Sequence, residues 1–174
     1  PLQKHDIVLQ SIGFLVDPEN ATVWRGPMAS QALMQLLNET LWPELDYLVV
    51  DMPPGTGDIQ LTMSQKLPVA GAVIVTTPQD VALADAKKAI QMFRQVNIPL
   101  LGLIENMSFY QCPSCGHQDD IFGTRGGLDL AGRYQVSVLG QLPLQAQIRE
   151  AGDAGTPIAL AKDNQTAEIY RKIA

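Results

Sequence analysis

The run Gly71-Ala72-Val73-Ile74-Val75-Thr76-Thr77-Pro78 decides the fold class of this chain. A short, continuous apolar run that ends at a proline is typical of a strand buried on both faces, as in parallel sheets. A second run of this kind covers residues 99–105. Residues 81–96, between the two runs, carry apolar side chains at helical spacing. Strand, helix and strand in this order predict parallel strands joined by a right-handed crossover.

The same alternation extends in both directions along the chain. Upstream, it predicts a first strand over 7–16, a helix that Gly26-Pro27 opens and Pro43 ends, a buried strand over 47–50, and a short helix over 59–66. Downstream, it predicts a loop over 108–123, a strand over 136–142, and helices over 126–134, 144–151 and 165–174. We therefore expect an α/β fold, with a mostly parallel sheet flanked by helices, and a single domain over residues 1–174.

Composition argues against several classes of partner. The 174 residues carry a formal net charge of −6, and no basic run is longer than Lys87-Lys88, whereas phosphate backbones are bound by clustered cations. Nucleic acid is therefore not an expected partner. No apolar run approaches the roughly 20 residues that span a bilayer, so no membrane partner is expected either. Two cysteines and no apolar leader favour a reducing, cytoplasmic location.

Asp51 ends the predicted strand 47–50, and a loop rich in proline and glycine follows from Pro53 to Gly57. A carboxylate at the end of a buried strand is a natural ligand for Mg²⁺, directly or through water. Gly55 and Gly57, ahead of Asp58, permit close backbone approach and a change of conformation. This pattern suits a loop that senses a terminal phosphate. The alternative is a strand-end turn whose aspartate caps the next helix.

Polar residues also follow the other two buried strands. Thr76 ends one strand, and Glu105 and Asn106 end the other. Because ligands gather at the carboxyl ends of parallel strands, we expect these residues and Asp51 to converge. The amide of Asn106 carries both a donor and an acceptor, so it can read the edge of a nucleobase. The alternative is an asparagine that only satisfies loop backbone.

Both cysteines lie in the string Cys112-Pro113-Ser114-Cys115-Gly116. Two thiolates at this spacing predict a metal or cluster site, and soft sulfur ligands select zinc, Cu(I) or iron–sulfur clusters. Two cysteines supply only half of a four-thiolate site. Completion would come from a second copy in a C2 homodimer or from a residue such as His117. A redox disulfide and a structural zinc knuckle are the rival interpretations.

Together these strings resemble the Mrp/ApbC family of iron–sulfur carrier ATPases. That family belongs to the deviant Walker-A class of P-loop proteins, alongside MinD and the nitrogenase iron protein. The motifs that carry the resemblance are Ser11 through Leu15, Trp24-Arg25-Gly26-Pro27-Met28, Leu45-Asp46-Tyr47, the segment from Asp51 through Asp58, Gly71 through Gln79, Glu105-Asn106-Met107-Ser108, Cys112 through Gly116, Ile121-Phe122-Gly123 and Ile148-Arg149-Glu150.

The resemblance implies a role for each matched position. Asp51 would be the Walker B acid near Mg²⁺, and Gly55, Gly57 and Asp58 would form the switch that follows the γ-phosphate of ATP. Asn106 would contact the adenine, with backbone near Pro143 beside the base. Cys112 and Cys115 would hold a [4Fe–4S] cluster between two subunits of a homodimer. The implied partners are apo iron–sulfur proteins that receive the cluster.

One departure from the family pattern is large. The chain contains no Gly-Lys-Ser or Gly-Lys-Thr string, so the phosphate-binding loop of the family is absent. That loop normally precedes the point where this chain begins. We therefore expect residues 1–174 to be the C-terminal part of a P-loop ATPase domain, incomplete at its N-terminus, that binds ATP weakly and does not hydrolyse it alone. The alternatives are a dimeric zinc-binding scaffold without ATPase activity and a partitioning ATPase like MinD.

Overall fold

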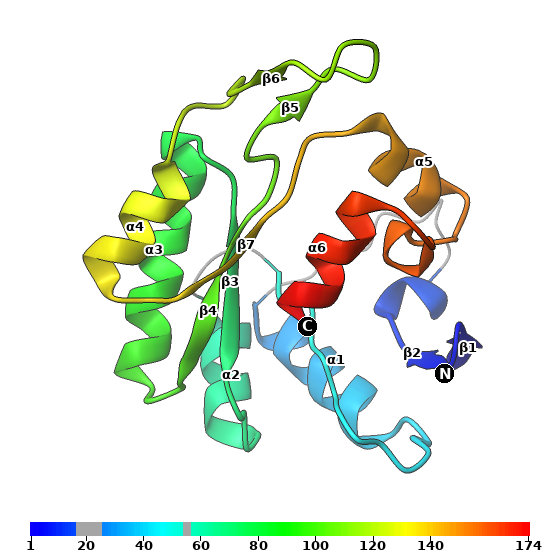
Figure 1. Ribbon diagram of the computed structural model, residues 1–174. Helices are drawn as coiled ribbons and strands as arrows, with labels where there is room; N and C mark the ends of the chain where they lie inside the picture. Colours follow the sequence, from blue (N-terminus) through cyan, green and yellow to red (C-terminus); the bar gives the residue numbers. More distant parts are fainter. Residues whose placement is uncertain (17–25, 54–56) are drawn as a thin grey trace. The chain divides into compact units, whose positions relative to one another are not determined.

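The computed structural model describes residues 1–16, 26–53 and 57–174. The chain divides into two compact units, Pro1–Pro68 and Val69–Ala174, and each is described by itself. The second unit contains most of the secondary structure (Figure 1). Its elements in chain order are β3 (Ala72–Thr76), α3 (Asp80–Gln95), β4 (Leu100–Glu105), β5 (Tyr110–Gln111), β6 (Gln118–Asp119), α4 (Gly126–Tyr134), β7 (Val138–Gln141), α5 (Ala146–Asp153), the 3-10 helix η2 (Ile158–Leu160) and α6 (Gln165–Ile173).

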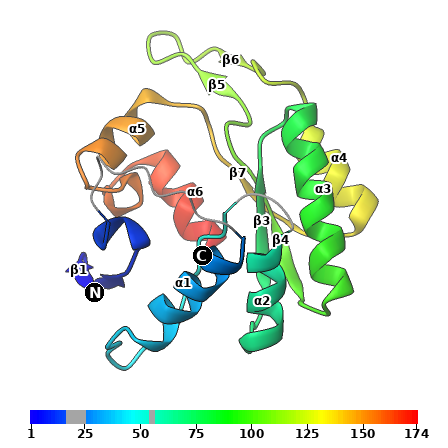
Figure 2. The ribbon, with the colours of Figure 1, turned by 180° about the vertical axis from the view of Figure 1, so that it is seen from behind.

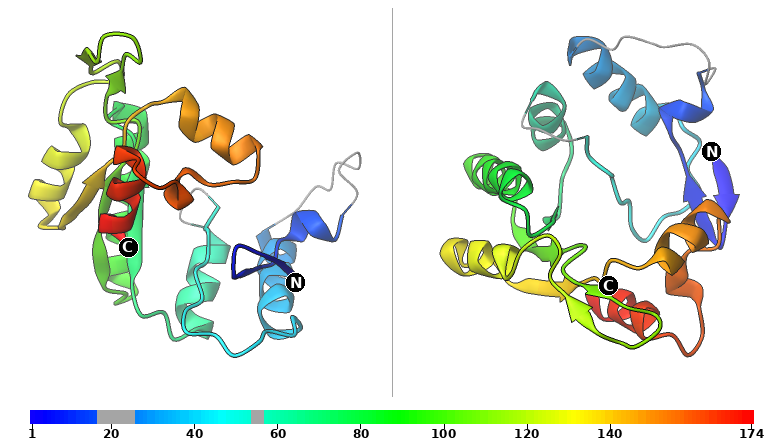
Figure 3. Two further views of the ribbon diagram at one scale, coloured as in Figure 1. Left: turned by 45° about the vertical axis from the view of Figure 1, so that its right-hand side comes forward. Right: turned by 90° about the horizontal axis from the view of Figure 1, so that it is seen from above.

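A three-stranded parallel sheet in the order β3-β4-β7 forms the centre of the second unit. The register places Thr76 opposite Glu105, and Glu105 opposite Gln141. Helices α3 and α4 lie on one side of this sheet and α6 lies on the other (Figures 2 and 3). Strands β5 and β6 form a separate antiparallel hairpin. The expected α/β fold with a parallel sheet flanked by helices is confirmed.

The core of this unit lies between the sheet and helices α3 and α4. Its buried members come from β3, β4, α3, α4 and the segment after α4, and they are Ile74, Ala86, Ile90, Leu103, Ala131 and Val136. The prediction that the runs 71–77 and 99–105 are buried on both faces is wrong, and in the second run Leu101 is 55% exposed. Ile74 and Thr76 are buried, whereas Val73 and Val75 are 42% and 61% exposed. Alternate side chains of a strand point to opposite faces, and only the face of β3 toward α3 is covered.

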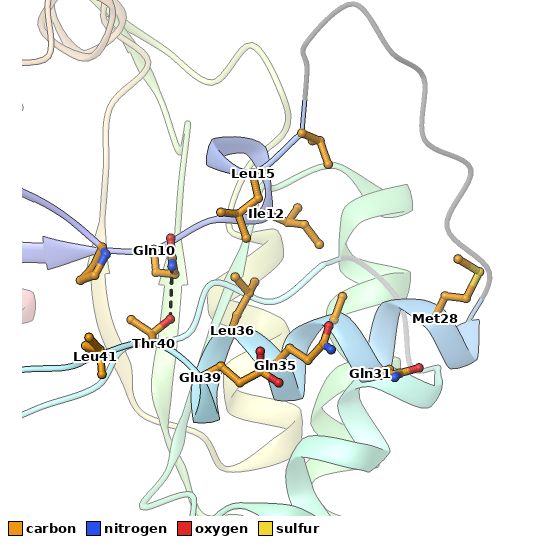
Figure 4. A pocket seen from close by; sticks show the side chains of 13 residues that line it. Gln10, Ile12, Leu15, Met28, Gln31, Gln35, Leu36, Glu39, Thr40 and Leu41 are labelled. Carbon is orange, nitrogen blue, oxygen red and sulfur yellow. Dashed lines mark hydrogen bonds between the residues drawn. The ribbon is translucent and has the colours of Figure 1, made fainter.

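The first unit contains fewer helices and strands, among its described residues, than the second. Its elements are β1 (Leu2–Lys4), β2 (Ile7–Leu9), the 3-10 helix η1 (Ile12–Phe14), α1 (Gly26–Asn38) and α2 (Asp58–Lys66). Strands β1 and β2 pair as an antiparallel hairpin. A hollow of about 640 Å³ lies beside η1 and α1, where Ile12 and Leu15 face Leu36 (Figure 4). None of the predicted site residues lines this hollow.

Three sequence predictions in the first unit are wrong. The strand expected over 7–16 ends at Leu9, because the Ser11 hydroxyl accepts a hydrogen bond from the Gly13 backbone and starts the 3-10 turn. The helix expected to reach Pro43 ends at Asn38. There the indole Nε1 of Trp42 donates to the Leu37 carbonyl at 2.9 Å, which satisfies one of the last carbonyls of the helix.

The apolar run 47–50 was the third wrong prediction, since it is neither a strand nor buried. Tyr47 is 87% exposed and Val49 is 89% exposed. Within the described residues, no strand pairs with this run, and an isolated strand leaves its backbone donors and acceptors without a ladder. β-propensity and apolar character are therefore not sufficient to form a strand here.

No helix in the described part of the chain is long and apolar enough to cross a membrane.

Candidate functional site

The carboxyl ends of β3, β4 and β7 meet at one edge of the second unit's sheet. The backbone N–H of Asn106 donates to the Thr76 carbonyl at 2.7 Å. Leu142 donates to the Glu105 carbonyl and Ser108 donates to the Leu142 carbonyl, both at 2.9 Å. These bonds join the turn after β4 to both neighbouring strand ends. The expected convergence is thus observed for Thr76, Glu105 and Asn106, whereas Asp51 belongs to the other unit.

Asn106 and Pro143, the predicted contacts of the nucleobase, lie on the two segments that these bonds join. The Asn106 side-chain oxygen Oδ1 accepts from the Met107 backbone N–H at 3.0 Å. Met107 has φ 53°, a left-handed conformation that non-glycine residues rarely adopt. The remaining end of the amide, Nδ2, is a donor and suits an acceptor on a base edge. Pro143 is buried and follows Leu142 directly.

Glu105 is completely buried at the end of β4. Its Oε1 accepts hydrogen bonds from the Ser108 hydroxyl at 2.6 Å and from Gln141 Nε2 at 2.8 Å. Its Oε2 accepts from the backbone N–H of Gly127 in the first turn of α4, where the helix dipole favours a negative charge. Every donor to this carboxylate comes from a different segment. Glu105 is therefore fixed by the turn, by β7 and by α4 together.

Sequence reasoning placed Glu105 at a strand end but did not assign it this buried role. The signal was present as a carboxylate at the end of the apolar run 100–105, because buried carboxylates require several donors. Its donors Gln141 and Gly127 are distant in sequence, and no local pattern connects them to it.

The two cysteines lie in the connection of the β5–β6 hairpin. Tyr110 pairs with Asp119, and Gln111 with Gln118. The backbone N–H of Cys112 donates to the His117 carbonyl and that of Gly116 donates to the Cys112 carbonyl, both at 2.9 Å. Gly116 has φ 73°, which a residue with a side chain would adopt only with strain. The predicted loop over 108–123 is thus a short hairpin with an ordered thiol-bearing turn.

The turn favours the thiolate form of Cys112. The pKa of the Cys112 thiol is lowered from its ordinary value of 9.0, chiefly by hydrogen bonds from the backbone N–H of Cys115 and then of Ser114, with a smaller contribution from the Cys115 side chain. Both cysteines are free thiols, and Cys112 is half-buried while Cys115 is exposed. A thiolate is the form of cysteine that binds metals.

A complete metal site is not present among residues 1–16, 26–53 and 57–174. No three side chains of His, Cys, Asp or Glu in those ranges lie close enough together to hold a metal ion. His117 therefore does not complete a three-ligand set with the two thiols. The cysteine pair offers two sulfur ligands, half of what a four-thiolate cluster or zinc site requires.

The base of the hairpin is attached to the segment that follows β7. Leu144 donates its backbone N–H to the Phe109 carbonyl at 2.7 Å, and Tyr110 forms a parallel bridge with Leu144. Gln145 donates to the Gln111 side chain at 3.4 Å and accepts from the buried Thr166 hydroxyl at 2.8 Å. The hairpin is thus joined to the sheet and to α6 by both backbone and side-chain bonds.

The predicted phosphate switch lies in the first unit and is described only in part. Asp51 is exposed on an irregular segment. Gly57 is the N-cap of α2 and Asp58 is the first residue of that helix, while Gly55 lies outside the described residues. Gln60 Nε2 donates to the Pro53 carbonyl at 2.9 Å, which ties the start of the loop to α2. The role of each of these residues stays a prediction.

Known proteins with similar sequences and similar folds support the family resemblance that the sequence motifs indicated. A family model described as ParA, NUBPL iron-transfer P-loop NTPase, matches residues 1–174. The iron-sulfur cluster carrier protein of Salmonella typhimurium is 57% identical over 175 residues, which cover 100% of this chain and 47% of that protein. The chain therefore spans about half the length of the curated relatives it matches.

Two solved structures are similar to this chain. The nucleotide-binding protein from Archaeoglobus fulgidus, in complex with ADP, has a TM-score of 0.65 and 37% identity, and the match covers 74% of this chain and 53% of that protein. The cell division ATPase MinD of Pyrococcus furiosus has a TM-score of 0.58 and 20% identity over 86% of this chain and 56% of its own, which shows a shared fold. With the family model matching its whole length, this chain belongs to the NUBPL iron-transfer P-loop NTPase family, as its resemblance to the Mrp/ApbC carriers indicated.

Proposed function

We propose that this chain is part of an iron–sulfur cluster carrier that holds a [4Fe–4S] cluster as cargo between two identical subunits and passes it to apo-proteins. The observation that carries the proposal is a pair of free thiols on a hairpin turn, without a third ligand among the described residues. Two copies of the turn together supply four thiolates, the number that a cubane cluster requires. The name of the Salmonella relative is consistent with this cargo.

The properties of the two thiols suit a site that both loads and releases. Backbone donors stabilise the thiolate of Cys112, which favours binding of soft metal centres. Cys115 is exposed, so an incoming apo-protein can reach its side of the site and compete for it by ligand exchange. Free thiols of this kind require a reducing compartment, and the cytoplasm is the location we propose.

The base of the nucleotide would bind at the carboxyl ends of β4 and β7, where Asn106 and Pro143 lie. Asn106 would donate to the base and backbone near Pro143 would lie beside it, a role consistent with the ADP found in the similar protein from Archaeoglobus. Asp51 would hold Mg²⁺, and Gly55, Gly57 and Asp58 would respond to the γ-phosphate. Since the 174 residues contain no Gly-Lys-Ser or Gly-Lys-Thr string, we propose that they do not hydrolyse ATP by themselves.

Anaerobic reconstitution with ferrous iron and sulfide tests the cargo. We expect a brown protein with charge-transfer absorption in the visible region and close to four irons and four sulfides per two chains. Cys115→Ala should abolish the colour, whereas Ser114→Ala, between the cysteines, should retain it. A colourless protein that binds one zinc per two chains would instead favour the dimeric zinc scaffold, because that alternative uses the same four thiolates.

A further inference from the structure

The buried carboxylate of Glu105 lies at the root of the cysteine hairpin. Its Oε1 accepts from the hydroxyl of Ser108, which lies in the turn after β4, two residues before β5 begins. Gln141 Nε2 donates to the same oxygen and to the Ser108 hydroxyl, both at 2.8 Å. These three side chains form a closed triangle of hydrogen bonds in a buried place. We call this set, Glu105, Ser108 and Gln141, the root triangle.

Backbone hydrogen bonds carry this anchoring into the hairpin. The Ser108 N–H donates to Leu142, the residue after Gln141, and the Leu144 N–H donates to Phe109, the residue after Ser108. Residues 108–110 and 142–144 are therefore hydrogen-bonded side by side, from the root triangle as far as the bridge between Tyr110 and Leu144. No bond of the root triangle involves the cysteines themselves.

We propose that Glu105 is a positioning residue that sets the direction of the cysteine hairpin through Ser108 and Gln141. The proposal rests on the proposed function only in taking the hairpin as the cluster site. Phe109 and Cys112 are three residues apart, which is about 10 Å of extended chain. A rotation of about 3° at the root would displace the thiol by about 0.5 Å, which is the tolerance of a functional constellation. In a site completed by a second copy, this displacement of the thiols would occur in both subunits.

The structure explains why a carboxylate occupies position 105. All of its partners donate hydrogen bonds: a hydroxyl, an amide nitrogen and the backbone N–H of Gly127. A buried acceptor of two oxygens satisfies all three donors, and its charge lies beside the N-terminus of α4. A side chain without acceptors would leave these donors unpaired, at a cost that is large in a buried place.

The test exchanges the hydrogen-bond acceptor at position 105 and the donor at position 141. Gln141→Glu places a second carboxylate where a donor lies 2.8 Å from Oε1. The double variant Glu105→Gln/Gln141→Glu restores one donor and one acceptor and has the wild-type net charge. Gln147→Glu makes the same chemical change at an exposed position of α5 and is the matched control.

The first readout is amide hydrogen exchange, which does not need a cluster. At pH 8, Gln141→Glu should lower protection of the Ser108 and Leu144 amides by at least about tenfold, the effect of losing one hydrogen bond to a charged group. The Cys112 and Gly116 amides, whose acceptors lie within the hairpin, should keep their protection. The double variant should return the root amides to wild-type values.

The second readout is the lifetime of the reconstituted cluster on exposure to a chelator. We expect Gln141→Glu to shorten it and the double variant to restore it, with Gln147→Glu unchanged. Loss of protection throughout the sheet in Gln141→Glu, or failure of the double variant to restore the root amides, would overturn the proposal. If wild-type protein takes up no cluster, the proposed function fails, and the exchange data alone decide the role of Glu105.

Discussion

The contact between Gly127 and Glu105 supports a stability prediction that can be worked out from the geometry. A Cβ added at Gly127 would lie 2.6 Å from Oε2 of Glu105 and 3.1 Å from its Cδ, whereas ordinary contacts begin at about 3.4 Å. Gly127→Ala therefore requires the carboxylate to move by roughly 0.8 Å. The neighbouring atoms are the partners that hold the carboxylate in place, so it cannot move without breaking hydrogen bonds.

The expected cost follows from two contributions. Overpacking in a filled interior costs about 1–3 kcal/mol, and loss of a hydrogen bond to a charged group costs about 1.5–3 kcal/mol. These overlap because the same shift causes both, and the helix preference of alanine over glycine offsets up to about 1 kcal/mol, so we expect the free energy of unfolding to fall by about 1–3 kcal/mol. Urea unfolding followed by circular dichroism measures it, with an unchanged m-value as the check for two-state behaviour.

Gly132→Ala is the matched control, because Gly132 lies on the same helix and a Cβ there meets no atom within 4 Å. Alanine is favoured over glycine within helices by about 1 kcal/mol, so this variant should be as stable as wild type or more stable. A Gly127→Ala protein within about 0.5 kcal/mol of wild type would refute the reasoning, since the carboxylate would then be free to move.

Three further predictions concern the thiol, the nucleotide and the core. Because backbone donors lower its pKa, Cys112 should be alkylated by iodoacetamide with a midpoint below the ordinary value of 9.0, and this shift should disappear in urea; an unshifted midpoint in folded protein would contradict the turn geometry. The 174-residue polypeptide should release no phosphate from ATP above background in a malachite green assay, and turnover matching a relative with a Gly-Lys-Ser/Thr loop would contradict this. Ile90→Ala should cost about 2–5 kcal/mol of unfolding free energy because Ile90 is fully buried, whereas Val81→Ala, at an 80% exposed position of the same helix, should cost less than about 0.5 kcal/mol, and equal costs would show that α3 packs by another face.

The second unit was predictable from sequence because its elements are specified locally. The helix over 126–134 matches α4 residue for residue, and the apolar run at 99–105 contains the whole of β4. In these segments hydrophobic periodicity and the flanking glycines and prolines agree with the tertiary packing. The burial of β3 was predicted less well, because a continuous apolar run cannot show which of its faces is covered.

The first unit was predicted poorly because its strands depend on partners that local pattern does not supply. The run 47–50 has the composition of a strand, but no described strand pairs with it. At Ser11 the predicted strand does not continue, because the side-chain hydroxyl accepts a hydrogen bond from the local backbone and a 3-10 turn forms instead.

The candidate site was predictable only in part. The spacing of the two cysteines was enough to predict that both thiols lie on one short turn, which is the arrangement in which they could bind the same metal or cluster. The register of the sheet then brought Thr76, Glu105 and Asn106 together, as the rule of carboxyl strand ends predicts. The root triangle could not be predicted, because Glu105 and Gln141 are 36 residues apart and meet only through the pairing of β4 with β7.

Native mass spectrometry of the anaerobically reconstituted protein tests most directly whether two copies share one cluster. We predict a dominant species of two chains with a single four-iron, four-sulfide cluster, which reverts to single chains when Cys112 and Cys115 are both replaced by alanine. A cluster or zinc ion retained by one chain alone would contradict the account, because the described residues of one chain offer only two of the four ligands.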